Sequence, residues 1–570
     1  MNKFEEELSF FLQNTLEDLS DFEGVAQPKK NKLQSFIAEG NKDLSSLAQT
    51  YSDFVEERKE LHLEEILHSQ INVAEFITAN VPLYAMPHLY QQLPRYSNGD
   101  GTSLDEIKCP FTSLATLKRH IIDKAVLSLY ETVSAPKDKK IVLFTYVMED
   151  GLGDFIAQRQ ALSILKEEFA DIQCIVLAPS QYKLHMQTSA VGSLIHYYES
   201  KERLHFTHFS EDICMALSEA SFLLQIPSFY PYFDQLLQKY EIKEHHTIGE
   251  YGFIDSSWAH PMKTDTCCMG LHFLERGIFI KQMPSLEKIQ LSADVQRKLL
   301  GSLSLDKYRK EKSFAFAYLK TLKGMRVFLH MALTYFSADE LDLDIAFTDL
   351  HDLLLLIKEG RLGIDEYKIK ELRISTKDKN YLIPMESQGK VVRFIEMGPL
   401  SSDDTKALIV LSQKLVGCTG NQSFSEAVSA SSCFFYDAAP HAGPFLQDFL
   451  EIAKCRLQEF PKAITFIEGF IKAFHFKEGK ACLEEIGKEL GTLLLDPETA
   501  RGLIELNRIL QNEYSFNQTL KQIIKRRLFV GMHPEVARNE EILIKDFVEQ
   551  KDSFTSFFEN LRVLLSDNKK

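Results

Sequence analysis

The apolar run at residues 141–147, Ile-Val-Leu-Phe-Thr-Tyr-Val, constrains the fold more than any other stretch of the chain. Such a run suits a strand covered by helices on both faces, as in parallel sheets, whereas a half-exposed strand alternates apolar and polar residues. A glycine turn, a helical stretch over 156–169 and a second short β-rich run over 174–178 follow it. This order predicts a βαβ unit, and 222–226 and 277–280 are further strand candidates.

A second set of strand candidates alternates with helical stretches further along the chain, at 313–319, 344–347, 391–395, 415–417 and 433–436. Alternation of this kind again indicates a parallel sheet. We therefore expect an α/β fold with two Rossmann-like domains, over residues 136–305 and 306–450. Apolar residues recur at helical spacing on either side, so 1–135 and 451–570 are predicted to be helical N- and C-terminal regions.

Charge and cysteine content narrow the class of protein. The 570 residues carry 65 basic and 81 acidic side chains, a formal charge of −16, and such a surface repels nucleic acid and anionic lipid. No run of about 18 apolar residues occurs, so no membrane span is predicted. The nine cysteines form no Cys-x-x-Cys pair, which favours reduced thiols in the cytoplasm over disulfides or zinc. Delivery into a host cell is compatible with this location, but nothing in the sequence shows it.

The loop at residues 149–154, Glu-Asp-Gly-Leu-Gly-Asp, directly follows the first predicted strand. Open α/β sheets bind ligands outside these strand ends. Gly151 and Gly153 let the backbone turn and approach a ligand closely. The carboxylates of Asp150 and Asp154 suit hydrogen bonding to hydroxyl groups, or removal of a proton from a nucleophile. The structural alternative is that Asp154 caps the next helix and Asp150 shapes the turn.

A second loop, residues 417–426, also follows a strand and opens a helix. It is rich in small residues and has no acid before Glu426, so its backbone N–H groups at a helix N-terminus suit an anionic phosphate. Ser423 offers a hydroxyl donor, and Glu426 can accept hydrogen bonds from two hydroxyls of a ribose. The alternative is an ordinary capped helix with Glu426 as its capping-box acid.

The two-domain layout, the Asp-x-x-Gly-Asp turn at 150–154 and the Gly-Asn-Gln-Ser-Phe-Ser-Glu-Ala segment at 420–427 resemble GT-B glycosyltransferases. Among these, the pattern is most similar to heptosyltransferases and to protein arginine rhamnosyltransferases. The resemblance implies two Rossmann-like domains that face a cleft, with the helical regions as extensions. It would make Asp150 the general base and Asp154 a supporting residue.

Substrate contacts follow from the resemblance and from the two loops. The acceptor would meet Gly151 and Gly153, while Tyr251, in a glycine-flanked turn of the same predicted domain, would stack on it or only pack in the protein. Donor contacts are predicted in the second domain, at Met397, Gly420, Asn421, Gln422, Ser423, Phe424 and Glu426.

The chain departs from the family at the late motif. Where the rhamnosyltransferases have an arginine before the glycine, this chain has Thr419, and it has Asn-Gln instead of Glu-Asp before Ser-Phe. The diphosphate charge must therefore be neutralised from elsewhere. Lys320 is the donor-site residue we assign to this role, with Lys323 and Arg326 as other candidates.

The sequence also bears on the type of reaction. Retaining GT-B enzymes often have a Glu-x7-Glu pair, but the positions eight residues from Glu426 hold Cys418 and Phe434, which favours an inverting reaction. Asp342 and Asp344 have a metal-type spacing, yet they open an apolar strand and are interpreted as its solvated edge. We therefore expect neither a metal nor a cofactor.

The sequence thus predicts a metal-independent, inverting glycosyltransferase that uses a nucleotide-diphosphate sugar as co-substrate, with a protein among the acceptors considered. The alternative is a catalytically inactive GT-B-like binding or scaffold protein. A Rossmann oxidoreductase is disfavoured, because neither loop has Gly-x-Gly-x-x-Gly with an acid about 20 residues on. A basic cluster at Lys521, Lys525, Arg526 and Arg527 is interpreted as a solvated helix face.

Overall fold

The computed structural model describes most of the chain from residue 126 to residue 567. The residues outside the description within this span are 137, 149–151, 184–185, 187–189, 191, 252–265, 272–274, 387, 413, 440–441, 477–482 and 549–553. Nearly all of the predicted N-terminal helical region therefore lies outside the described residues, and so do Asp150 and Gly151 of the first loop.

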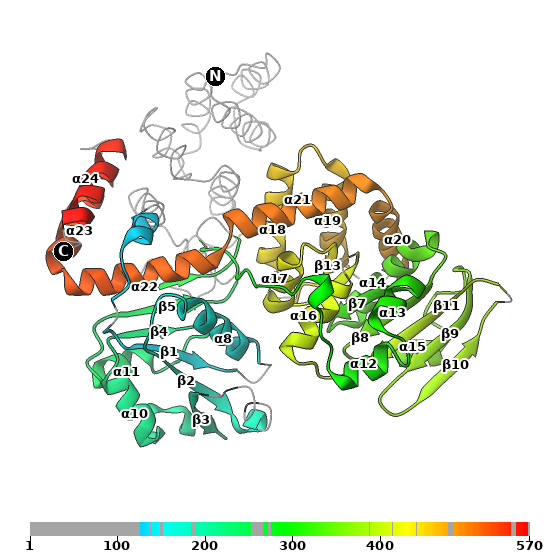
Figure 1. The fold of residues 1–570 in the computed structure, drawn as a ribbon, viewed down its shortest axis with the longest axis horizontal. Coiled ribbons are helices and arrows are strands. Elements are labelled where there is room, and N and C mark those ends of the chain that lie inside the picture. The colour runs from blue at the N-terminus through cyan, green and yellow to red at the C-terminus, as the bar shows by residue number, and fades with distance from the viewer. Residues whose placement is uncertain are drawn as a thin grey trace, which may run out of the picture. The chain divides into compact units, whose positions relative to one another are not determined.

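The described chain divides into two compact units, each with its own sheet (Figure 1). Unit 1 holds the described residues of 126–277 and 516–567, and unit 2 holds those of 278–515. The predicted α/β class with two Rossmann-like domains is confirmed. The first passage between the units falls at Gly277–Ile278, whereas the sequence placed the domain boundary near residue 305.

The sheet of unit 1 has six strands in the order β3-β2-β1-β4-β5-β6, and every pair in it is parallel. The strands are β1 (Ile141–Tyr146), β2 (Ile172–Pro179), β3 (Ser193–Tyr198), β4 (Phe222–Gln225), β5 (His245–Gly249) and β6 (Thr266–Cys268). The first five residues of β1 are buried, as a strand covered on both faces requires. From β1 the chain first adds strands on one side of the sheet, as β2 and β3, and then on the other side, from β4 onward. Parallel sheets bind ligands at such a switch point, so ligands are expected at the carboxyl ends of β1 and β4.

Helices cover both faces of this sheet. Phe155 of α8 (Gly153–Leu165) packs with Val176 and Ala178 of β2. The neighbouring β2 residues, Ile175 and Leu177, belong to the other face, where α10 (Glu211–Ser218) and α11 (Phe233–Lys239) pack. The C-terminal helices α22 (Phe516–Met532), α23 (Pro534–Val548) and α24 (Phe554–Asp567) belong to the same unit. Figure 1 shows α22 beside α8.

The sheet of unit 2 has seven strands in the order β10-β9-β11-β8-β7-β12-β13. The strands are β7 (Lys312–Tyr318), β8 (Asp342–Phe347), β9 (Ile369–Ser375), β10 (Asn380–Pro384), β11 (Lys390–Glu396), β12 (Val416–Cys418) and β13 (Phe434–Tyr436). All pairs are parallel except β10 with β9. Here the succession reverses between β7 and β12, which places the expected ligand edge at the loops that follow these two strands.

The helices of unit 2 are α12 (Ala293–Leu299), α13 (Leu305–Glu311), α14 (Leu322–Tyr335), α15 (His351–Lys358), α16 (Ser402–Leu411), α17 (Asn421–Ser429), α18 (Gly443–Arg456), α19 (Pro461–Phe474), α20 (Leu483–Leu494) and α21 (Pro497–Glu513). Side chains that cap a first turn and so set a helix start are Ser292, Ser304, Thr321, Ser401 and Asp496. Glycines on α20 allow it to lie close to α14, since a Cβ on Gly487 would be 2.5 Å from the Val327 carbonyl oxygen.

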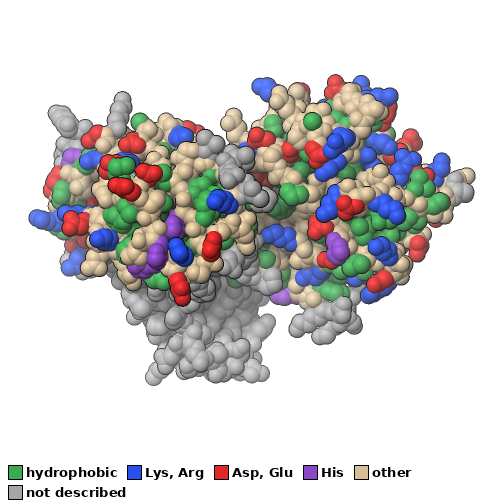
Figure 2. All heavy atoms as spheres, turned by 90° about the horizontal axis from the view of Figure 1, so that it is seen from below, with side chains coloured by type: hydrophobic (Ala, Val, Ile, Leu, Met, Phe, Trp, Pro, Cys, Tyr) green, Lys and Arg blue, Asp and Glu red, His purple; other side chains and the backbone are tan. Residues whose placement is uncertain are grey.

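The helical C-terminal region is thus shared between the units. Helices α18–α21 belong to unit 2, and α22–α24 return to unit 1. Among the described helices, none is long and apolar enough to span a membrane. Acidic and basic side chains are interspersed on the face shown in Figure 2, so the net negative charge does not form one patch there.

Candidate functional site

The first candidate site residues lie at the carboxyl end of β1. Asp154 is the second residue of α8, and its buried Oδ2 accepts a hydrogen bond of 3.1 Å from the backbone N–H of Met148. The carboxylate therefore ties the start of α8 to Met148, which follows β1. Apart from its chain neighbours and its own helix, no atom of the described residues lies within 4 Å of a Cβ built on Gly153. The roles of Asp150 and Gly151 stay predictions, because both lie outside the described residues.

An aromatic cluster lies near the same strand ends. Its members are Tyr146, Tyr198, His205, Tyr230 and Tyr232. Ring centroids are 6.0 Å apart for Tyr146 with Tyr198 and 4.7 Å apart for His205 with Tyr232. Tyr146, His205 and Tyr232 are partly exposed, so their rings offer faces on which a sugar or peptide group can stack. This cluster was not predicted from the sequence, because its members come from four separate stretches of the chain.

Tyr251 follows β5 at the same edge of the sheet. Its side chain is only 4 % exposed. Tyr251 is therefore mostly packed inside the protein, which is one of the two roles that the sequence left open for it.

The second candidate site is the turn between β12 and α17 in unit 2. Gly420 is the N-cap of α17 with φ of 78°, a conformation that favours glycine. It offers no side-chain cap, and the first turn of α17 holds no acid. Within the described part of the chain, no atom other than those of its chain neighbours lies within 4 Å of a Cβ built on Gly420. The turn therefore combines open space with the positive end of a helix dipole, which suits a phosphate group.

Of the predicted donor residues, Ser423 uses its side chain to stabilise this turn, and Phe424 uses its side chain to pack in the core. Ser423 donates its hydroxyl to the Thr419 carbonyl oxygen at 2.6 Å and accepts from the Thr419 N–H at 3.1 Å, so it closes the turn. The Phe424 ring is fully buried and packs edge-on against rings of β13 and α18, at 5.0 Å from Phe445. Any contact of Phe424 with a ligand would use its backbone. Gln422 is partly exposed, and its Oε1 has no hydrogen-bond partner among the residues that the structure describes.

Glu426 is buried and paired. The Lys281 ammonium lies 2.6 Å from its Oε1, and the Lys281 backbone N–H donates to the Ser429 hydroxyl at 2.9 Å. Burial lowers the pKa of Lys281 below its ordinary value. Burial, together with the nearby Glu426 carboxylate, raises the pKa of Tyr318 at the end of β7. Lys281 was missed from the sequence, since nothing local marks a lysine 145 positions away as a partner.

Asp437, which follows β13, joins the two loops at the ligand edge of unit 2. Its Oδ2 accepts hydrogen bonds from the Thr321 hydroxyl at 2.7 Å and the Thr419 hydroxyl at 3.3 Å. Thr321 also caps α14 by accepting from the Gly324 N–H at 2.9 Å. Burial raises the pKa of Asp437. Asp437 was not among the predicted site residues. The pattern that could have indicated it is an acidic residue directly after a buried strand.

Other predicted donor contacts lie near these loops. Met397, directly after β11, is buried, and its carbonyl oxygen accepts from the Lys298 ammonium at 2.7 Å.

Lys320 is exposed after β7. The Lys323 ammonium donates to the Phe474 carbonyl oxygen at 3.0 Å, and Arg326 is ion-paired with a glutamate of α20. Of the three basic candidates, Lys320 has the side chain most accessible to a ligand.

Asp342 and Asp344 were both expected at the solvent-exposed edge of their strand, but the structure buries one of them. Asp342 pairs with the Lys312 ammonium at 2.7 Å, but Asp344 is buried, accepts from the Tyr308 hydroxyl at 2.8 Å and pairs with Arg393. The solvated-edge interpretation was therefore wrong for Asp344, because α13 and β11 cover this strand. Among the described residues, no group of three or more His, Cys, Asp or Glu side chains is arranged to hold a metal.

Comparisons with known proteins give structural matches alone. No protein-family model and no curated protein sequence matches the chain. Calicheamicin glycosyltransferase CalG4 has a TM-score of 0.37 and 11 % identity, covering 69 % of this chain and 98 % of that one. Anabaena HepE in complex with UDP-glucose has a TM-score of 0.37 and 12 % identity, covering 68 % and 99 %. Spinosyn rhamnosyltransferase SpnG, complexed with spinosyn aglycone, has a TM-score of 0.37 and 9 % identity, covering 66 % and 97 %. At these scores and identities, the matches assign the chain to no family.

Proposed function

We propose that this protein is a glycosyltransferase of the GT-B type, which moves a sugar from a nucleotide-diphosphate sugar to an acceptor. The observation that carries the proposal is the turn at Gly420, an open and uncapped helix N-terminus at the edge where the strand order of unit 2 reverses. An α/β sheet binds ligands at this edge, and a helix N-terminus attracts phosphate. The helical regions favour a protein among the acceptor classes.

In this proposal the donor binds unit 2. The backbone N–H groups at Asn421 and Gln422, together with the Nε2 amide of the Gln422 side chain as a further donor, hold the diphosphate. Lys320 supplies the positive charge that the family places beside the glycine. Glu426 accepts hydrogen bonds from ribose hydroxyls, and the Lys281 ammonium holds that carboxylate in place through their ion pair. The backbone at Met397 reads the base.

The proposed reaction is a single displacement with inversion. Asp150 removes the proton of the acceptor nucleophile while that atom forms a bond to the anomeric carbon. The bond from the anomeric carbon to the diphosphate oxygen breaks, and its electron pair leaves with the nucleoside diphosphate. The helix dipole of α17 and Lys320 stabilise this leaving charge, so the proposed step uses no metal. Asp154 supports the site by joining the start of α8 to Met148 through the Met148 N–H.

The experiment is a mass-spectrometric screen of a mixed nucleotide-sugar pool, first for hydrolysis by the native chain and then for transfer to candidate proteins. The variant Asp150→Asn should lose transfer while its donor affinity stays within about twofold, since Asp150 acts in transition-state chemistry and not in donor binding. Full turnover by Asp150→Asn would refute the assignment of the base. The matched control is Asp138→Asn, which lies before β1 and should leave turnover unchanged.

A catalytically inactive binding or scaffold protein is the second candidate. One observation favours it: Thr419, where the family has arginine, is buried and donates to Asp437, so it is not available to a donor phosphate. A thermal-shift series with nucleotide sugars separates the two functions. A functional donor site predicts a concentration-dependent rise in Tm with at least one of them, whereas a lost site predicts no rise with any.

A further inference from the structure

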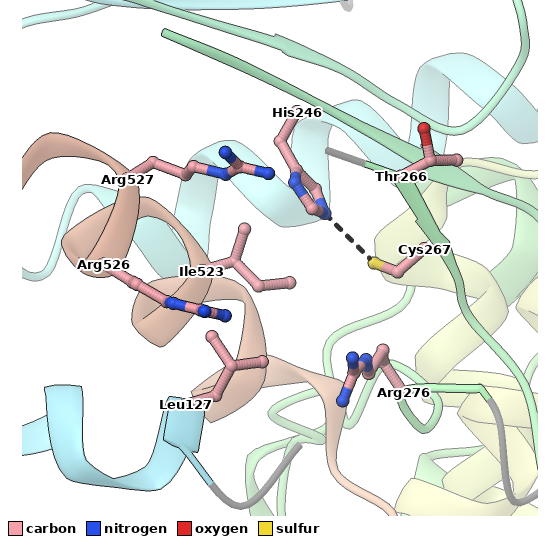
Figure 3. A pocket seen from close by; sticks show the side chains of 8 residues that line it. All are labelled: Leu127, His246, Thr266, Cys267, Arg276, Ile523, Arg526 and Arg527. Carbon is pink, nitrogen blue, oxygen red and sulfur yellow. Dashed lines mark hydrogen bonds between the residues drawn. The ribbon is translucent and has the colours of Figure 1, made fainter. Parts of the chain in front are cut away.

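A pocket in unit 1 brings three arginines together, at a place that the proposed reaction does not use. Arg276, Arg526 and Arg527 line it with His246, Cys267 and Thr266 (Figure 3). We call it the arginine pocket. Arg526 and Arg527 extend from α22, His246 and Cys267 come from β5 and β6, and Arg276 stands just before the chain leaves unit 1 at Gly277.

The arginine pocket is separate from the ligand edge of this sheet. His246 and Cys267 are the second residues of parallel strands, whereas the acceptor loop follows the carboxyl end of β1. Gly249 ends β5 three residues beyond His246, a path of about 10 Å along a strand. A ligand in the arginine pocket would therefore contact the C-terminal helix α22 and not the loop that we propose for catalysis.

Positive charge exceeds negative charge among the described residues that line this pocket, because none of them is acidic. Glu540 of α23 pairs with Arg526 and also accepts a hydrogen bond from the Tyr130 hydroxyl. The carboxyl group of Glu275 lies over Gly270, where a Cβ would meet its Oε2 at 1.8 Å. Two further guanidinium groups, those of Arg276 and Arg527, face the same space (Figure 3).

The thiol and imidazole on the pocket wall are oriented toward each other. The Nε2 of His246 lies 3.4 Å from the Sγ of Cys267, and both side chains are buried. This contact fixes the imidazole at the wall of the pocket. The remaining described residues that line the pocket are Thr266, Leu127 and Ile523.

We propose that the arginine pocket binds a phosphate group, as inorganic phosphate or as the phosphate of a small phosphomonoester. Planar guanidinium forks bind phosphate oxygens in a bidentate way, and such charge-assisted hydrogen bonds are stronger than neutral ones. The bound phosphate joins Arg276, just before the chain leaves unit 1, to Arg527 on the helix that returns to it. The proposal does not depend on the glycosyltransferase assignment.

The same structure corrects the interpretation of the basic cluster on α22 as a solvated face. Lys521 pairs with Glu167 at 2.5 Å, and the largely buried Lys525 pairs with Glu168 at 2.5 Å. Arg526 and Arg527 line the pocket. The cluster therefore packs inside unit 1, because α22 lies against α8 and the edge of the sheet, and a helix face that looks exposed in the sequence is covered.

The test is calorimetric titration of inorganic phosphate into the full chain, with sodium chloride at matched ionic strength as the blank. Arg527→Gln should weaken phosphate binding about tenfold or more, since it removes a charged hydrogen-bonding partner. Lys521→Gln is the matched control: it removes one positive charge from the same helix but no pocket side chain, and it should leave phosphate affinity unchanged. Arg527→Lys, which keeps the charge and loses the fork, should fall between the two.

Hydrogen exchange locates the bound phosphate and separates this pocket from the Gly420 turn. Phosphate should slow amide exchange in α22 around residues 523–527 and in β6, and Gln422→Ala should not change this. Circular dichroism verifies that each variant is folded, and loss of protection with Arg527→Lys gives a second readout if Arg527→Gln does not fold. Three results would overturn the proposal: no saturable binding, equal loss with Lys521→Gln, or protection confined to α17.

Discussion

The ammonium group of Lys281 lies 2.6 Å from a carboxylate oxygen of Glu426, and the two side chains are only 6 % and 7 % exposed. This pair links the segment that enters unit 2 with the helix that opens at the proposed donor turn. A buried ion pair is costly to break, because removal of one partner leaves the other charge desolvated and unpaired.

Lys281→Met should therefore lower the free energy of unfolding of unit 2 by about 3–5 kcal/mol, measured by urea denaturation. The double variant Lys281→Met, Glu426→Leu should recover most of this loss, because no charge remains buried. Lys307→Met serves as the control, since its pair with Glu311 is 3.7 Å long and exposed, and it should cost less than about 1 kcal/mol. Equal losses in the two single variants would contradict this account.

Asp437 should make the stability of unit 2 depend on pH in an unusual direction. Burial raises its pKa in the folded state above the unfolded value, so the folded state holds the proton more tightly. The resulting stabilisation is fully present below the unfolded pKa of about 4. It is lost as the pH rises through the higher folded pKa.

Asp437→Asn removes this titration and leaves a side chain that still accepts from the Thr321 hydroxyl. The native chain should thus lose stability relative to Asp437→Asn as the pH rises from about 4 through the folded pKa. Urea unfolding of both proteins across this pH range measures the difference. A difference that stays constant with pH, or that grows in favour of the native chain, would exclude the raised pKa.

Replacement by alanine should change stability in opposite directions at two helical glycines. A Cβ on Gly324, in the first turn of α14, would lie 2.3 Å from the Asp437 carboxyl group, whereas Gly153 in α8 has open space around it. Gly324→Ala should cost about 1–3 kcal/mol through overpacking. Gly153→Ala should raise stability by about 0.5–1 kcal/mol through the lower entropy of the unfolded chain. Thermal unfolding measures both, and similar values for the two would argue against the close contact at Gly324.

Gln422→Ala tests the donor turn without disturbing the core. Among the described residues, the Gln422 Oε1 has no hydrogen-bond partner, so truncation removes no internal contact of that oxygen, while it removes the Nε2 donor that would bind the diphosphate. We expect the affinity for a nucleotide-diphosphate sugar to fall about threefold to tenfold with little change in Tm, as for one lost hydrogen bond. Gln447→Ala on α18, whose amide binds Glu451 instead, should leave donor affinity unchanged. Identical donor affinities in both variants would exclude Gln422 from the donor contacts.

Much of the fold was predictable wherever a strand is apolar along its whole length. The 141–147 run is β1, and 433–436 closely matches β13. The hairpin of β9 and β10 was not predicted, because its strands lie at the sheet edge, where buried and exposed residues alternate. The candidate at 277–280 forms isolated bridges instead of a sheet strand, and marks the passage between the units.

Local sequence alone determined that two parallel sheets form and that glycine-rich loops follow their central strands. Continuous apolar runs, glycines and helical periodicity act between near neighbours, so these features are visible in short segments. The tertiary structure decided which charged and polar side chains lie together. Lys281 pairs with Glu426, Asp437 accepts from two threonines, and Arg276 lines one pocket with the arginines of α22. Those contacts depend on strand order and on the return of the C-terminal helices to unit 1. Since chain neighbours do not encode that order, only the folded molecule could identify these residues as partners.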